Sequence, residues 1–145
     1  MTSIEGRFQM GQLLTWKAEY SVGISEIDQQ HKGLVGMMNE LHDAMMQGKG
    51  SEVLGGILER LIEYTQVHFK TEEDLFEKYG YARAKEHIAE HKKLIADVEK
   101  FNKDNLAEKA ILSVDVLDFL GDWLKKHIVA SDRAYGPFLN SKGVR

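Results

Sequence analysis

Cysteine is absent from this chain of 145 residues. Without thiols there is no disulfide framework, no thiolate metal site and no CxxCH haem attachment, so every metal ligand must be a nitrogen or an oxygen atom. The sequence also lacks an apolar run of the roughly 18 to 20 residues that a membrane span needs, and it does not open on a charged-apolar-small secretory leader. We therefore expect a cytoplasmic protein with no membrane partner.

A strongly basic balance is missing as well. Nineteen Lys and Arg residues face 23 Asp and Glu residues, for a formal net charge of −4. Phosphate backbones require a concentrated positive field, so nucleic acid is not an expected partner. Residues 4–7 read IEGR, a processing-protease sequence used in fusion proteins, so residues 1–7 are predicted to be a vector-derived tag. Residues 8–145 have the length of one domain with a single core.

Proline is nearly absent, because Pro137 is the only one in the chain. A long stretch without a strong helix breaker favours long helices. Apolar residues recur at three-four spacing in four segments, at about residues 25–47, 51–79, 82–101 and 112–130. The connections are short and strand-like alternation is not evident. The pattern predicts an all-α, antiparallel up-down-up-down four-helix bundle, with residues 8–24 as a non-helical N-terminal arm.

Local signals predict where the helices begin and end. Ser25-Glu26-Ile27-Asp28 fits a capping box for the first helix. Ser51 is expected to cap the second helix, and Gly80 is expected to end it. Polar or turn-forming stretches predict the remaining ends, at residues 47–50, 102–105, 131–132 and 136–137.

Five of the six histidines occupy positions where the apolar stripes call for a core residue, and a glutamate accompanies them: His31, His68, Glu72, His87, His91 and His127. Burying a polar group without a partner costs roughly 2 kcal/mol, and a bare carboxylate costs more. One such histidine would normally bond to a backbone carbonyl, but a set this large needs a common partner. In the predicted topology all five lie at one level of the bundle, whereas His42 lies about 16 Å further along and is not expected to join them.

The stretch HIAEH at residues 87–91 matches the HxxEH motif of inverted zinc peptidases. Little chain follows it to supply a third ligand, five imidazoles exceed a tetrahedral zinc site, and Glu90 is rotated about 100° toward solvent or a neighbouring helix. A ferritin-like di-iron site would need ExxH pairs, which do not occur here. One haem between two histidines would leave three imidazoles and Glu72 without partners.

Four motifs together resemble the hemerythrin family, particularly its bacterial members: DQQH at 28–31, HFKTEE at 68–73, HIAEH at 87–91 and HIVASD at 127–132. The resemblance covers about residues 14–139. It implies two non-haem irons joined by an oxo or hydroxo bridge, one held by His87, His91 and His127, the other by His31 and His68, with Glu72 and Asp132 bridging both. Asp132 lies about 140° round an ideal helix from His127, so the helix must distort between them.

By that resemblance, the iron with two histidines has one open position, where O2 binds reversibly. We expect O2 storage or delivery, and not an enzyme. The alternative is an O2-sensing or redox-sensing domain excised from a larger chemotaxis-type signalling protein. Peroxide reduction or nitric oxide handling is less expected, because no acid-base group is visible beyond the ligands. Expected partners are O2 and either a downstream O2-using enzyme or a signalling domain.

Five further residues are candidates for the surroundings of the irons. Leu124, one turn before His127, is the first candidate for an apolar wall of the O2 pocket, with Trp16 and Ile27 as weaker ones. Asp28 and Tyr135 are candidates for hydrogen bonds that orient the ligands, although Asp28 also fits the capping box.

Overall fold

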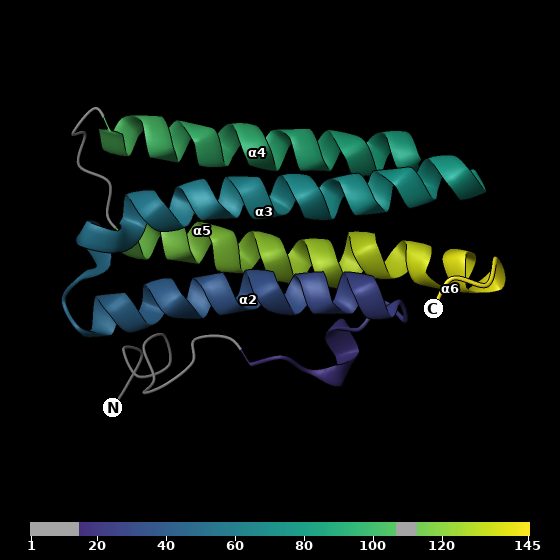
Figure 1. Cartoon of the computed structure of the whole chain (residues 1–145), viewed down its shortest axis with the longest axis horizontal. Helices are drawn as coiled ribbons and strands as arrows, with labels where there is room; N and C mark the ends of the chain where they lie inside the picture. The colour runs from purple at the N-terminus through teal and green to yellow at the C-terminus, as the bar shows by residue number, and fades with distance from the viewer. Residues whose placement is uncertain (1–14, 107–112) are drawn as a thin grey trace.

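Four long helical rods lie side by side in the computed structural model, which describes residues 15–106 and 113–145 (Figure 1). The elements in chain order are η1 (Ala18–Tyr20), α2 (Ser25–Met46), α3 (Gly50–Tyr79), α4 (Ala84–Leu106), α5 (Ser113–Lys126), η2 (His127–Asp132) and α6 (Arg133–Ser141). The last three follow one another without a break and form the fourth rod. The predicted antiparallel all-α bundle is confirmed, and no strand occurs in the described residues.

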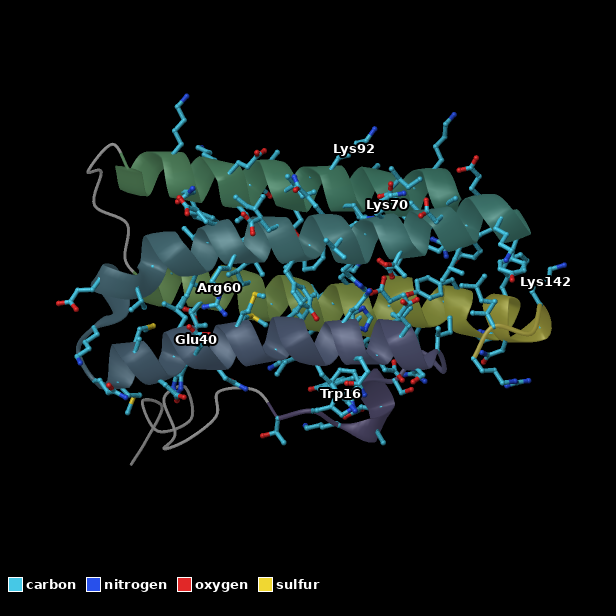
Figure 2. All side chains as sticks on the ribbon, in the orientation of Figure 1. Trp16, Glu40, Arg60, Lys70, Lys92 and Lys142 are labelled. Atoms are coloured by element: carbon cyan, nitrogen blue, oxygen red, sulfur yellow. The ribbon has the colours of Figure 1, made fainter. Side chains whose placement is uncertain are left out.

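The rods pack as neighbours around a common interior. α3 packs against both α2 and α4, and α2 packs against α5. α4 meets α5 through Phe101 and Phe119, whose ring centroids are 5.2 Å apart. Arg60 on α3 donates to both carboxylate oxygens of Glu40 on α2 at 2.7 and 3.1 Å (Figure 2). Both side chains are half exposed, so this pair contributes about 1 kcal/mol at most and the apolar interior holds the bundle together.

The apolar interior has two parts with a polar layer between them. The larger part fills the middle and one end of the bundle and includes Leu41, Leu58 and Leu117. The smaller part lies at the other end, where Ile27, Phe76 and Tyr135 pack together. Along each of the four rods the predicted histidines fall between residues of these two clusters. Their side chains are therefore surrounded by apolar groups.

The predicted capping box is wrong, because the N-cap of α2 is Ile24 and no side chain caps it. The Asp28 carboxylate instead accepts hydrogen bonds from Ser21 Oγ at 2.5 Å and from Val22 N at 2.9 Å. These bonds tie the arm to the first turn of α2, where the helix dipole also stabilises the negative charge of Asp28. The predicted stop at Gly80 is confirmed: this residue is left-handed (φ 72°) and its N–H donates to the Phe76 carbonyl.

Two predicted helix ends are wrong because packing overrides local signals. α4 continues through residues 102–105 to Leu106, since the preference of Asn and Asp against helix is below about 1 kcal/mol per residue. The fourth rod continues past Pro137 to Ser141. There Tyr135 and Leu139, one turn apart, are both fully buried, and this packing keeps the segment helical.

The described part of the arm, residues 15–24, is non-helical except for the 3-10 turn η1. Trp16, labelled in Figure 2, lies in this part of the arm. It packs edge-on against Tyr20, with ring centroids 5.6 Å apart, and Lys32 of α2 lies over its ring. The predicted tag, residues 1–7, and the start of the predicted arm lie outside the described residues, as does residue 112. Among the described helices, none has the length and apolar character needed to cross a membrane.

Candidate metal centre

The structure brings all seven predicted ligand side chains together inside the bundle. They come from four rods, and none is more than 4% exposed: His31, His68, Glu72, His87, His91, His127 and Asp132. The imidazoles contact one another, with ring centroids 4.7 Å apart for His31 and His68 and 4.8 Å apart for His87 and His127. The predicted convergence at one level is confirmed. His42 is buried but belongs to neither group of clustered side chains.

The seven side chains form two groups that share two carboxylates. Glu72 and Asp132 lie with three imidazoles in one group, those of His87, His91 and His127. The same two carboxylates lie with the imidazoles of His31 and His68 in the other group. Within each group, one potential ligand atom per residue lies within 4.8 Å of all the others. This geometry suits two neighbouring metal ions bridged by carboxylates.

A π-helical turn brings Asp132 into the cluster. Residues His127–Asp132 form η2, in which backbone bonds run from residue i to residue i+5. His127 and Asp132 are five residues apart, and the wider turn places Nε2 of the first 3.0 Å from Oδ1 of the second. The distortion expected between these residues is therefore confirmed. Such single π turns interrupt helices mainly at functional sites.

The cluster atoms that face the centre have no hydrogen-bond partner within the described part of the chain. These atoms include Nε2 of all five histidines, Glu72 Oε1 and both carboxylate oxygens of Asp132. Several lie very close together, such as His31 Nε2 and Asp132 Oδ2 at 2.7 Å, without hydrogen-bond alignment. Buried polar atoms are almost always satisfied in folded proteins, so a common partner at the centre is expected. Nitrogen and oxygen donors without sulfur fit borderline divalent metals such as iron.

The charges of the cluster are strongly coupled. Burial and the Asp132 carboxylate raise the pKa of Glu72, but neighbouring imidazoles outweigh them and lower it to about 2. Burial lowers the pKa of His68 to about 4. Burial also acts to lower the pKa of His87, but the close carboxylates of Asp132 and Glu72 raise it to about 9. Burial also acts to raise the pKa of Asp132, but neighbouring imidazoles hold it well below its ordinary value, so both carboxylates are ionised, as metal ligands must be.

Three imidazoles have an outer hydrogen-bond partner that sequence reasoning missed. Nδ1 of His68 lies 2.6 Å from Gln30 Oε1, Nδ1 of His91 lies 3.0 Å from Glu73 Oε2, and Nδ1 of His127 lies 2.9 Å from Glu90 Oε1. Each partner directly precedes or follows a cluster residue in the sequence. A residue next to an inward-facing one is rotated about 100°, so it reaches the adjacent helix. That rotation is the signal by which they could have been found.

Tyr135 holds one carboxylate in place through the Oε2 oxygen of Glu72. Its hydroxyl donates a short hydrogen bond to Glu72 Oε2, and the residue is fully buried. Burial and the Glu72 charge raise the pKa of this phenol well above its ordinary value. Tyr135 therefore lies where a residue that orients a ligand was expected, whereas Asp28 bonds to the arm.

Apolar and aromatic side chains enclose the cluster. The Phe69 ring stacks on His91 with centroids 3.7 Å apart, and the Trp123 ring stacks on His127 at 4.3 Å. Leu124 and Trp123 also line a small cavity of about 20 Å³. This cavity lies one or two helical turns from the cluster, with Leu34, Leu94 and other apolar residues on its walls.

The two weaker candidates for the wall lie elsewhere. Ile27 is fully buried in the smaller apolar cluster, on the opposite side of the imidazoles from the cavity. Trp16 lies in the arm, packs against the larger cluster from outside and does not line the cavity.

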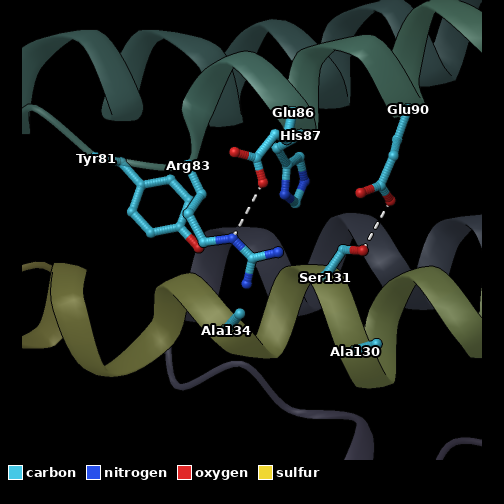
Figure 3. Close-up of a pocket in the computed structure, with 8 residues that line it drawn as sticks. All are labelled: Tyr81, Arg83, Glu86, His87, Glu90, Ala130, Ser131 and Ala134. Carbon is cyan, nitrogen blue, oxygen red and sulfur yellow. Dashed lines mark hydrogen bonds and ion pairs between the residues drawn. The ribbon is translucent and has the colours of Figure 1, made fainter.

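A second, larger pocket of about 130 Å³ lies between α4 and the η2–α6 segment (Figure 3). Glu90 of α4 accepts a hydrogen bond from Ser131 Oγ across it, at 2.7 Å. Arg83 pairs with Glu86 on the same helix at 3.3 Å. His87 is part of the lining, so this pocket brings solvent close to the side of the centre that holds three histidines.

Comparisons with known proteins agree with this geometry. The family described as hemerythrin HHE cation binding domain matches residues 22–139. Bacteriohemerythrin of Methylococcus capsulatus is 40% identical over 130 residues, which cover 89% of this chain and 98% of that protein. Bacteriohemerythrin of Clostridium acetobutylicum is 33% identical, with 85% and 98% covered. A crystal structure of wild-type hemerythrin superposes with a TM-score of 0.79 at 39% identity, covering 86% of this chain and 96% of that one. This chain belongs to the hemerythrin family, whose di-iron site the buried cluster of histidines and carboxylates matches.

Proposed function

We propose that this protein binds O2 reversibly at a di-iron centre, for storage or delivery. The observation that carries the proposal is the unequal division of imidazoles, three and two, around the two shared carboxylates Glu72 and Asp132. Three imidazoles, two carboxylates and a solvent-derived oxo or hydroxo bridge make six ligands for one position. Two imidazoles with the same carboxylates and bridge make five, which leaves one place for an external ligand.

The residues divide as the geometry groups them. His87, His91 and His127 would hold one iron, His31 and His68 would hold the other, and Glu72 and Asp132 would be shared by both. With iron bound, the pair of ferrous ions would supply the open coordination position and the two electrons that reversible O2 binding requires. Tyr135 keeps Glu72 oriented as a bridge through its hydrogen bond.

The surroundings of the centre favour binding over catalysis. Thr65 is the only polar residue among those that line the 20 Å³ cavity, and its hydroxyl donates to the Ile62 carbonyl at 3.0 Å. No described residue on that wall is therefore an acid that could deliver a proton to a ligand in the cavity. An apolar wall that includes Leu124 limits access of water and protons, and so favours release of O2 unchanged.

The lengths of the relatives favour storage or delivery over sensing. This chain covers 98% of the bacteriohemerythrins of Methylococcus capsulatus and Clostridium acetobutylicum. Those relatives are therefore about the size of one bundle, without room for a signalling domain. A bundle of this kind would supply O2 to an O2-using enzyme.

Iron analysis combined with absorption spectroscopy tests the proposal. We expect two irons per chain and an absorption band that forms when the reduced protein meets O2 and disappears when O2 is removed. His127→Ala should lose the iron with three histidines and the band, whereas His42→Gln, at a buried histidine outside the cluster, should keep both. One zinc per chain, no metal, or normal O2 binding by His127→Ala would refute the assignment.

A further inference from the structure

The outer hydrogen-bond partners of the imidazoles differ between the two metal positions. On the side with three histidines, the carboxylates of Glu73 and Glu90 bond to Nδ1 of His91 and His127. On the side with two histidines, the partner of His68 is the neutral amide of Gln30. Among the described residues, no carboxylate bonds to an outer nitrogen on that second side.

The hydrogen-bond network fixes which ring nitrogen carries the proton. A carboxylate only accepts, so Nδ1 of His91 and of His127 must donate, and Nε2 presents its lone pair to the centre. The Glu90 carboxylate is itself held by Ser131 Oγ at 2.7 Å, which aligns it across the pocket of Figure 3.

The Gln30 amide is oriented by a second chain of bonds. Its Nε2 donates to Thr71 Oγ1 at 3.2 Å, and the Thr71 hydroxyl donates to the Val67 carbonyl at 3.1 Å. Gln30 Oε1 therefore faces His68 and accepts from it. These histidines therefore carry their proton on Nδ1 at both metal positions. The two positions differ in the charge of the group that accepts this N–H hydrogen bond, a carboxylate at one and a neutral amide at the other.

We infer that Glu73 and Glu90 are positioning residues that make the two iron positions electronically unequal. A carboxylate that accepts from an imidazole N–H makes that imidazole a stronger electron donor to its metal, and a neutral amide does so less. The position with three histidines is thereby the easier one to oxidise. With two ferrous irons bound, loss of one electron to an external acceptor such as ferricyanide, which becomes ferrocyanide, would leave Fe(III) at that position and Fe(II) beside His68. This inference rests on the proposed function.

The variants Glu73→Gln and Glu90→Gln test it, because they keep the shape and an acceptor oxygen but remove the charge. Gln30→Glu adds a carboxylate on the other side. Glu86→Gln is the matched control, since Glu86 lies one turn before Glu90 on α4, pairs with Arg83 and, among the described residues, is not hydrogen-bonded to an imidazole nitrogen.

Two measurements separate an electronic effect of Glu73 and Glu90 on the metal from a purely structural role. The first is Zn(II) affinity of the iron-free protein, with the Nδ1 proton shifts of His91 and His127 read by NMR in the zinc form. We expect each Glu→Gln variant to weaken zinc binding by about tenfold and to move the proton of its own histidine. The second is the midpoint potential of the first oxidation, for which a tenfold change in equilibrium corresponds to about 59 mV. It should rise in both variants and stay constant in Glu86→Gln.

Mössbauer spectra of the half-oxidised protein locate the ferric ion. In the parent we expect the ferric spectrum at the position with three histidines, and in Gln30→Glu a weaker preference for that position. If Glu73→Gln and Glu90→Gln match the control in potential, zinc affinity and proton shift while keeping two irons, the inference is refuted and the proposed function stands. If the parent does not bind two irons, the proposed function fails first, and the inference fails with it.

Discussion

Removing the metal should lower the melting temperature of this protein by at least about 10 °C. The magnitude follows from the cluster, in which nine buried nitrogen and oxygen atoms of the seven proposed ligands have no hydrogen-bond partner among the described residues. Each such atom costs about 1 to 3 kcal/mol when it is left unsatisfied. The low end of that range gives about 9 kcal/mol, which is comparable to the whole stability of an ordinary domain, about 5 to 15 kcal/mol.

Pairing of imidazoles with carboxylates recovers part of this cost in the metal-free protein. His87, for example, keeps a proton more tightly there because Asp132 and Glu72 lie close to it. If only a third of the cost remains, the loss of unfolding free energy is about 3 kcal/mol. For a chain of this size each kcal/mol lowers the melting temperature by about 3 °C, so the total shift is about 10 °C. The loss should be largest at the end of the bundle that contains η2 and α6, since these elements are held by the cluster.

Circular dichroism melts of metal-replete and chelator-stripped protein measure the effect, and readdition of ferrous iron under nitrogen serves as the reversibility control. Hydrogen exchange of the stripped protein should show lost protection in η2 and α6. Protection should persist around Leu58 and Leu117, in the larger apolar cluster. Equal melting temperatures within about 2 °C, together with unchanged exchange in η2, would show that the cluster is stable without a metal.

Three further predictions concern packing, pH and the O2 pocket. Gly136→Ala should cost about 3 kcal/mol, at the upper end for overpacking, because an added Cβ would clash with the backbone carbonyl of Val22; an unchanged urea midpoint would contradict it. The metal-free protein should be most stable near pH 6.5, the ordinary pKa of histidine in the unfolded chain. Stability should fall as the pH rises from there through about 9, where His87 loses its proton in the folded protein. It should also fall as the pH drops toward 4, because the buried His68 gains a proton less easily in the folded protein than in the unfolded chain. Urea titrations from pH 4 to pH 9 would reveal a flat or monotonic profile if this is wrong. Leu124→Ala should enlarge the 20 Å³ cavity, cost about 2 to 5 kcal/mol and speed oxidation of the O2-bound form as water enters, and an oxidation rate like that of the parent would argue against Leu124 as the wall.

Periodicity and residue type predicted those features of the protein that depend on local sequence. The three-four spacing of apolar residues predicted the bundle, and polar histidines within those stripes predicted a buried centre with a common partner. Gly80 predicted the end of α3, since a left-handed residue there favours glycine. Asp132 could be identified only through the family resemblance, because an ideal helix would have placed it away from His127.

The failures came where long-range packing outweighs local preference. Asn102–Asn105 read as a helix end, yet α4 runs on to Leu106. Pro137 read as part of a turn, yet buried Tyr135 and Leu139 hold α6 together around it. Asp28 was predicted to be the capping partner of Ser25, but its carboxylate accepts hydrogen bonds from Ser21 and Val22. The path of the arm brings these two residues close to Asp28, and local spacing does not indicate that path.

The sequence alone determined that long helices assemble with imidazoles from each of them at one height, because a helical repeat of 3.6 residues fixes which side chains share a face. Helical spacing did not specify how those imidazoles divide into three and two around shared carboxylates, which the family resemblance implied, and only the tertiary structure decided which glutamate or glutamine reaches each outer nitrogen. Both depend on distances between rods and on one π turn, η2, and spacing along a chain does not specify either. The chemistry of the centre was therefore encoded locally, and its asymmetry arises from packing.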